Sequence, residues 1–297
     1  MLYVTAIGSS APRKLVAGIE ASHPCNQNPS SLPTRFPFKL KLFLLSQTKF
    51  TNLLVEFHSN PLHTLNILPF ARLSCSVSAL FACLKVWDAI KILDAADVDN
   101  PEASSAIVEI YSQRIVPKSL AGKPEGWNRE HLWPRSYGLR RGPSLTDLHN
   151  IHPADTNVNS SRGNKYFGEC QVKSPECLKP ASKEAASDTE SDKEKWAPPK
   201  HVRGDIARAV MYMAVSYGFQ LSDSPNKGNN EMGLLSTLLK WNKGDPPSRE
   251  EKLRNDRICK FYQHNRNPFI DHPEYAQLIW KQISPIRESS KFLKGKQ

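Results

Sequence analysis

The sequence predicts an α+β fold, in which short strands occupy the middle of the chain and packed helices follow toward the carboxyl end. Residues 106–112 contain β-branched and aromatic side chains suited to a strand, and residues 127–134 read as a strand that Pro134 ends. Residues 203–219 and 232–242 carry apolar side chains at helical spacing. Strands and helices in separate stretches of one chain are typical of the α+β class.

The composition is that of a soluble globular protein with a strong positive charge. The chain has 297 residues, enough for one large domain or two small ones, with 39% hydrophobic and 23% charged residues. Lys and Arg number 40 against 29 Asp and Glu, which gives a formal net charge of +11. This surplus favours a polyanionic partner, nucleic acid before an anionic membrane. No apolar run reaches the length of a membrane-spanning helix, so we expect no membrane span.

Residues 1–86 differ in composition from the rest of the chain. They are rich in Ser, Thr, Pro, Leu and Phe, and they contain few acidic residues. This bias suits an organelle transit peptide, and it equally suits a mispredicted gene start at which non-coding sequence is translated. We expect little stable fold in most of this segment, then a folded domain over residues 87–285 and a basic tail over residues 286–297.

The elements of the folded part begin at Trp87. We expect, in order, a helix over 87–97, a helix start or a turn at 100–102, a strand over 106–112, a loop over 117–126, a strand over 127–134, a turn over 136–144 and a strand or extended segment over 145–153. Asp155 and Thr156 are good N-cap residues, so a helix should follow Pro153. A hairpin that leads into a helix can hold two side chains opposite each other across a small cleft.

Beyond this hairpin and helix, the sequence predicts one polar loop and then helices. Residues 171–202 are rich in Lys, Glu and Ser, and their central part, 183–195, should be solvated and mobile. We then expect helices over 203–219, 232–242, 245–264 and 274–283, with a turn over 265–275.

The six cysteines include no CxxC pair, so a zinc ribbon or a thioredoxin-type site is not expected. Cys170 and Cys177 lie close together in a stretch that resembles a loop. They would form a local disulfide in an oxidising compartment, and the alternative is two free thiols.

Two groups that act on protons or metals, Glu130 and His131, stand side by side between Trp127 and Trp133. Glu130 and Asn159 both offer oxygen ligands, which suit a hard ion such as Mg²⁺. His131 has an ordinary pKa near neutrality, so a neutral imidazole could take a proton from water. Neighbours in a strand face opposite ways, so Glu130 and His131 can share one site only if the strand ends or bulges there.

The three segments N-R-E-H-L-W-P, D-L-H-N-I-H-P-A-D and N-V-N-S-S-R-G-N-K-Y-F follow one another in this order. This pattern resembles the endonuclease I family, which comprises bacterial periplasmic or secreted and plant nonspecific nucleases of the ββα-metal (His-Me finger) type. The resemblance spans roughly residues 87–285. It implies a ββα-metal hairpin–helix unit and packed carboxyl-terminal helices.

The resemblance also implies roles for single residues. His131 matches the general base that activates the attacking water, and Glu130 and Asn159 match the ligands of Mg²⁺ or Mn²⁺. The metal would bind the scissile phosphate and stabilise the leaving 3′-oxygen. The family also holds phosphate with an arginine, for which the candidates are Arg140, Arg141 and Arg162.

Other polar residues of these segments have competing interpretations. Asn157, Asn150 and Asn164 stand near Asn159, and a helix cap is the alternative role of Asn159. Asp147 and His149 are expected to be structural or to support the ligands. His152 stays unassigned.

We therefore expect a metal-dependent, sequence-nonspecific endonuclease that hydrolyses DNA, with RNA as a further substrate, to products with 5′-phosphates. The alternative is a nucleic-acid-binding module with an inactive nuclease site. A metal-dependent peptidase is disfavoured because the HExxH motif is absent. The expected protein is a monomer that is secreted or organellar, with nucleic acid as its partner.

Overall fold

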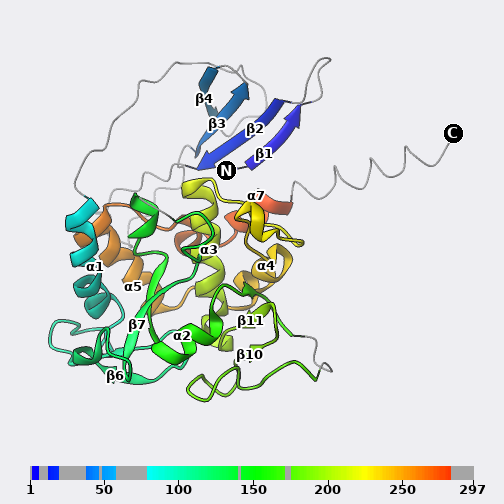
Figure 1. Cartoon of the computed structure of the whole chain (residues 1–297). Coiled ribbons are helices and arrows are strands. Elements are labelled where there is room, and N and C mark those ends of the chain that lie inside the picture. Colours follow the sequence, from blue (N-terminus) through cyan, green and yellow to red (C-terminus); the bar gives the residue numbers. More distant parts are fainter. Residues whose placement is uncertain are drawn as a thin grey trace.

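The computed structural model describes residues 2–6, 13–19, 38–46, 49–57, 79–139, 142–170 and 175–281. Its described part is mixed, with helices and several small sheets, which confirms the α+β class (Figure 1). No helix within these ranges is long and apolar enough to cross a membrane.

Four strands lie before residue 79. They are β1 (Leu2–Ala6), β2 (Arg13–Ile19), β3 (Phe38–Ser46) and β4 (Lys49–Phe57), and each pairs antiparallel with the next. The sequence prediction overlooked them, although Phe38–Ser46 begins with an alternation of apolar residues and lysines that is typical of a strand. The division of the chain at residue 86 stays a prediction.

The middle of the chain forms a helix, two hairpins and a second helix. These elements are α1 (Ala79–Leu93), β5 (Ala106–Val108), β6 (Ile115–Pro117), η1 (Lys118–Leu120), β7 (Trp127–His131), η2 (Pro143–Leu145), β8 (Ile151–Asp155) and α2 (Thr156–Arg162). β5 pairs with β6, and β7 pairs with β8, both antiparallel. The predicted strand–turn–strand–helix order is therefore confirmed.

The second strand of this hairpin is shorter than expected over residues 145–153. Leu145 ends a 3₁₀ turn, and β8 begins only at Ile151. Between them the Asp147 carboxylate accepts the backbone N–H of His149 at 2.9 Å, and its carbonyl oxygen accepts that of Asn150 at 3.0 Å. An aspartate that binds its own following backbone favours a turn over a strand.

Helix α2 begins directly where β8 ends. Asp155 is the last residue of β8 and the N-cap of α2, and its Oδ1 accepts the backbone N–H of Asn157 at 2.8 Å and of Val158 at 3.0 Å. The predicted N-cap is therefore confirmed, and the helix starts three residues after Pro153.

A small sheet follows α2. Its strands are β9 (Tyr166–Phe167), β10 (Glu190–Ser191) and β11 (Lys195–Ala197), in the order β10-β11-β9. Thr189 is fully buried and Ser191 is 1% exposed. The prediction that residues 183–195 are solvated is therefore wrong for this part, because the hairpin of β10 and β11 packs onto the core.

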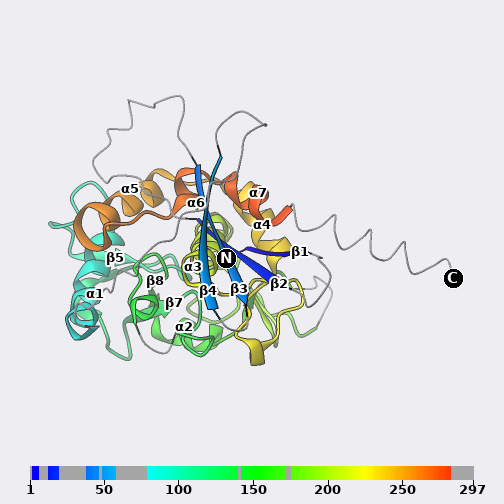
Figure 2. The same ribbon diagram turned by 90° about the horizontal axis from the view of Figure 1, so that it is seen from above.

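The carboxyl-terminal part is helical. Its elements are η3 (Lys200–Val202), α3 (Arg203–Tyr217), η4 (Lys227–Asn229), α4 (Leu235–Gly244), α5 (Arg249–Arg257), the π-helical turn η5 (Ile258–Gln263), α6 (Pro268–Asp271) and α7 (Tyr275–Lys281). Ser248 caps α5 by accepting the backbone N–H of Glu251, and Asn267 caps α6 by accepting that of Phe269. α3 runs through the middle, with α4 and α7 on one side and the β7–β8 hairpin on the other (Figures 1 and 2).

Two apolar clusters form the core, and the β7–β8 hairpin contributes to both. Trp127 and Ile151 pack with α1 in the smaller cluster, whereas Ala154 and Val158 belong to the larger cluster around α3. The hairpin and the start of α2 are thus fixed on two sides by buried apolar contacts.

Arg254 of α5 ties this hairpin to α1. It is 8% exposed, and its Nε and Nη2 atoms lie 3.0 and 3.1 Å from the two carboxylate oxygens of Asp94. It also donates to the carbonyl oxygens of Leu148 and Ile151, each at 2.8 Å. His152, which the sequence left unassigned, lies 3.1 Å from Asp94 through its Nδ1 and completes this buried cluster.

Candidate active site

The candidate residues lie where β7 runs beside α2. Side chains two residues apart on a strand share a face, so Asn128 and Glu130 point to the same side of β7. Asn159 and Arg162 are three residues apart on α2 and likewise share a face. Asn159 Nδ2 donates to Asn128 Oδ1 at 2.5 Å, and Arg162 Nη1 donates to Glu130 Oε1 at 2.9 Å. Two side-chain pairs therefore join the strand to the helix.

Glu130 is a buried carboxylate that two side chains hold by one oxygen. It is 3% exposed, and its Oε1 accepts the Tyr111 hydroxyl at 2.8 Å in addition to Arg162 Nη1. Burial raises the pKa of Glu130, while the charge of Arg162 and the hydrogen bond from Tyr111 lower it, and the net change is a rise. The positive charge of Arg162 thus compensates a carboxylate that burial alone would drive toward its neutral form.

Arg162 also binds the backbone at the end of β7. Its Nη1 donates to the carbonyl oxygen of His131 at 3.1 Å, and its Nη2 donates to that of Leu132 at 2.7 Å. Successive carbonyl groups of a regular strand point in opposite directions, so one guanidinium can bind both only where the strand ends. β7 ends at His131, which meets the condition that the sequence set for Glu130 and His131.

His131 is held by a backbone carbonyl group. Its Nε2 lies 3.0 Å from the carbonyl oxygen of Leu145, and because a carbonyl only accepts, this contact favours the tautomer with the proton on Nε2 and the lone pair on Nδ1. Burial lowers the pKa of His131 to about 4 against the effect of this hydrogen bond, and the charges of Arg135 and Arg129 lower it further. His131 is therefore neutral at pH 7, as a general base must be.

The structure places the predicted site residues in different positions. Glu130, His131 and Asn159 all lie on the β7–β8–α2 unit, and their catalytic roles stay predictions. Arg162 is 1% exposed and its terminal nitrogens bind protein groups, so its position opposes the predicted contact with a phosphate. The other two phosphate candidates, at positions 140 and 141, lie outside the described residues.

Sequence reasoning did not single out Tyr111 or Asn128. Asn128 stands two residues before Glu130, so the alternation of side chains along a strand could have identified it. Tyr111 is 19 residues away from Glu130 in the sequence, and no pattern connects the two. The contact between Tyr111 and Glu130 depends on how the chain between β5 and β6 lies against β7.

The oxygen atoms of this unit fit a hard divalent ion. Tyr111 and Arg162 both bind Oε1 of Glu130, and the backbone of His131 also makes a hydrogen bond to this carboxylate. Asn159 donates a hydrogen bond from its Nδ2 to Asn128. The Oδ1 of Asn159 therefore points away from Asn128. A carboxylate and an amide oxygen, completed by water and a substrate phosphate, form a donor set that Mg²⁺ accepts.

Asp147 and His149 are buried groups that hold the segment after Leu145. Asp147 is 2% exposed, and its Oδ2 accepts the hydroxyls of Tyr212 at 2.8 Å and Tyr217 at 2.6 Å. The ring of His149 lies 4.6 Å from the ring of Tyr212, centroid to centroid. These contacts agree with the structural role that the sequence favoured.

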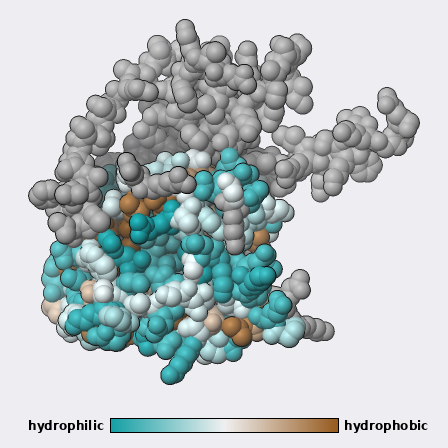
Figure 3. Space-filling model, in the orientation of Figure 1, coloured by the Kyte–Doolittle hydropathy of each residue, from teal (hydrophilic) through white to brown (hydrophobic). Residues whose placement is uncertain are grey.

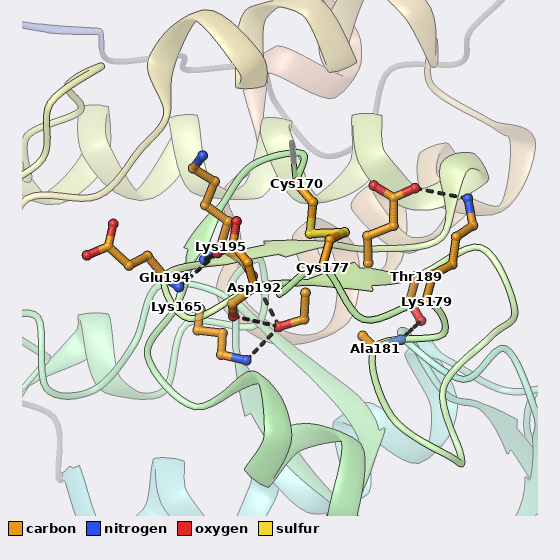
Figure 4. The surroundings of a disulfide bond; sticks show 11 residues. Lys165, Cys170, Cys177, Lys179, Ala181, Thr189, Asp192, Glu194 and Lys195 are labelled. Atoms are coloured by element: carbon orange, nitrogen blue, oxygen red, sulfur yellow. Dashed lines mark hydrogen bonds and ion pairs between the residues drawn. A yellow bond between two sulfur atoms is a disulfide. The ribbon is translucent and has the colours of Figure 1, made fainter. Parts of the chain in front are cut away.

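Cys170 and Cys177 are joined by a disulfide with Cα atoms 5.8 Å apart (Figure 4). The sequence had left free thiols as the alternative. Their sulfur atoms and a carboxylate oxygen of Glu190 are the one group of three or more His, Cys, Asp and Glu ligand atoms in the described ranges that could share an ion. Because disulfide sulfurs offer no thiolate, this group is not a metal site.

Comparison with known proteins identifies the family. The family model described as endonuclease I matches residues 83–274. Extracellular ribonucleases of Bacillus amyloliquefaciens and Bacillus subtilis (strain 168) are 41% and 39% identical over 208 and 211 residues, and each alignment covers 66% of this chain and 67% of the relative. A periplasmic deoxyribonuclease of Aeromonas hydrophila is 34% identical over 126 residues, 42% of this chain and 47% of the relative.

The family match extends from within α1 to beyond α6, and so it contains the whole β7–β8–α2 unit. The resemblance that the sequence motifs suggested is thereby confirmed. This chain belongs to the endonuclease I family of nucleases.

Proposed function

We propose that this protein is a metal-dependent, sequence-nonspecific endonuclease that hydrolyses phosphodiester bonds of nucleic acid to products with 5′-phosphates. In this proposal β7, β8 and α2 are the ββα-metal, or His-Me finger, unit. The observation that carries it is the neutral His131 with Nδ1 as its basic nitrogen, one residue from a held carboxylate on the same hairpin.

His131 acts as the general base. Leu145 fixes the tautomer, so Nδ1 takes the proton from the attacking water while Nε2 keeps its own. A neighbouring carbonyl that accepts from Nε2 also stabilises the imidazolium that this transfer produces. The buried surroundings keep the ring neutral until substrate arrives.

Glu130 and Asn159 would hold Mg²⁺ or Mn²⁺. The ion, when bound, would polarise the scissile phosphate and stabilise the negative charge that develops on the leaving 3′-oxygen. The charge of Arg162 lowers the pKa of Glu130 against the larger effect of burial, and Asn128 orients the Asn159 amide. Each residue of the unit thus has a separate task.

Both nucleic acids are proposed as substrates. The relatives with the longer alignments carry the name ribonuclease, and the deoxyribonuclease aligns over a smaller part of the chain. The net charge of +11 favours contacts with phosphates, which all sequences share. The described part of the face in Figure 3 is largely hydrophilic, as expected of a surface that binds a solvated polyanion.

The test is cleavage of plasmid DNA and of a long RNA by the full chain, with Mg²⁺ or with EDTA. We expect cleavage with Mg²⁺ and none with EDTA. His131→Ala should lose at least about 100-fold in rate, the lower range for a general base. His272→Ala, at the end of α6 beside Glu274, is the matched control and should cleave normally.

Two outcomes would contradict the proposal. Cleavage that persists in EDTA would exclude the metal dependence. Folded protein that retards nucleic acid on a gel and never cleaves it would instead support a binding module with an inactive nuclease site.

A further inference from the structure

One oxygen of Glu130 is held from two sides by buried donors. Tyr111 is fully buried and Arg162 is 1% exposed, and both donate to Oε1, at 2.8 and 2.9 Å. We call Tyr111 and Arg162 the Glu130 clamp. Both side-chain donors bind Oε1, so Oε2 is the carboxylate oxygen that neither of them engages.

Each member of the clamp is itself fixed by packing. The ring of Tyr111 meets that of Trp196 edge to face, with centroids 5.3 Å apart. The guanidinium of Arg162 lies over the ring of Phe167, 4.6 Å from its centroid. Arg162 is fixed further by the carbonyl oxygens at the end of β7. Neither donor can follow Glu130 to another rotamer.

Rotation of the Glu130 carboxylate would therefore be costly. It would leave the buried Tyr111 hydroxyl without its acceptor and the Arg162 charge without its partner. A buried donor without an acceptor is unfavourable, and a buried charge without a partner is more so. The contacts thus select one orientation of the carboxylate before any ion binds.

We propose that Tyr111 and Arg162 are positioning residues that present Glu130 Oε2 as the single carboxylate ligand of the divalent ion. This inference rests on the proposed function. Arg162, which the sequence offered as a phosphate contact, acts through Glu130 instead. Partners of metal ligands commonly affect ion affinity about 10- to 100-fold.

The test is Mn²⁺ binding, measured by calorimetry on the full chain that carries His131→Ala, so that no turnover intervenes. Tyr111→Phe and Arg162→Lys are added separately. Phenylalanine keeps the ring, and lysine keeps the charge, so a change in affinity reports the orientation of the carboxylate. We expect the Kd for Mn²⁺ to rise at least about tenfold in both variants.

A matched control distinguishes positioning from general damage to the core. Tyr137 is also buried in the core around α3, and its hydroxyl donates to the carbonyl oxygen of Asn164 at 2.8 Å. Tyr137→Phe removes a similar hydrogen bond and should leave the Kd unchanged. In the active background, Tyr111→Phe should raise the half-saturating Mg²⁺ concentration much more than it lowers kcat at saturation.

Three results would be decisive against parts of this inference. Unchanged Mn²⁺ affinity in Tyr111→Phe, with normal thermal unfolding, overturns the clamp even if Arg162→Lys fails to fold. An equal loss in Tyr137→Phe assigns the effect to the core and also overturns it. If the parent binds no Mn²⁺, or if Glu130→Gln binds as well as the parent, the metal site of the proposed function fails instead.

Discussion

Nε2 of His131 lies 3.0 Å from the carbonyl oxygen of Leu145, the last residue of the short turn η2. This contact determines which ring nitrogen is basic, and it comes from a backbone group that substitution of a side chain cannot remove. Burial of the same ring lowers the pKa of His131 and so determines the pH at which the basic nitrogen is protonated.

The pH dependence of cleavage should reflect this buried histidine. Since the pKa of His131 is lowered to about 4, the ring is neutral from pH 7 down to about pH 5. We expect kcat/KM at saturating Mg²⁺ to stay level over this range and to fall about tenfold per pH unit below about 4. A fall that begins between pH 7 and 6, near the ordinary value of imidazole, would contradict this environment.

His149 should make stability depend on pH. Burial lowers its pKa to about 4 in the folded protein, against about 6.5 in the unfolded chain. The free energy of unfolding that depends on the neutral ring of His149 is complete above the unfolded pKa of about 6.5, and it is lost as the pH falls toward 4. At pH 5 the loss is about 2 kcal/mol. Urea unfolding at pH 7 and 5 gives the total loss, to which the buried His131 also contributes, and comparison with a His149 variant isolates the part that belongs to His149. His149→Gln, which keeps a donor for the Asn265 carbonyl group, should show a smaller difference between the two values of pH.

Removal of Arg254 should destabilise the hairpin through its contacts with α1. Arg254→Ala leaves the buried Asp94 carboxylate with only the neutral His152 of its two side-chain partners, and it leaves two carbonyl groups without a donor. The expected loss is about 3–5 kcal/mol in the free energy of unfolding, measured with urea at pH 7. Lys260→Ala, on the exposed side of the π-helical turn, should change it by less than about 0.5 kcal/mol. Similar values for the two variants would contradict the role of Arg254.

The disulfide between Cys170 and Cys177 should stabilise the fold without taking part in the chemistry. The two residues are 7 apart in the sequence, and a loop of this size gives about 2 kcal/mol when the unfolded chain is constrained. The double variant Cys170→Ser with Cys177→Ser should unfold at a correspondingly lower urea concentration and keep its cleavage rate at 25 °C. A large loss of rate in the folded double variant would show that the loop contributes to the site.

Patterns that depend on neighbours in the sequence were predicted well. The N-caps at Asp155 and Ser248 are satisfied by backbone N–H groups within three residues, so local chemistry determines them. The end of β7 before Pro134 and the start of α2 after Pro153 follow from the same kind of short-range constraint.

Contacts between distant segments were not predictable in the same way. Arg162 offered a charge that could bind phosphate, and only the packing of α2 against β7 shows that its donors are buried. Tyr111 lies in the predicted strand 106–112, but the strand ends at Val108 and the chain turns there. Thr189 and Ser191 are polar residues in a polar stretch, so nothing in the sequence indicated that pairing with β11 would bury them.

The absence of a linker between β8 and α2 has a consequence for changes of chain length. Each residue added to an α-helix turns it by about 100° and advances it by about 1.5 Å. An insertion at Asp155–Thr156 would therefore rotate Asn159 and Arg162 away from β7 together, and no loop is present to absorb the change. Natural variation at this junction should consist of substitutions, while insertions and deletions should be confined to the turns before Ile151 and after Arg162.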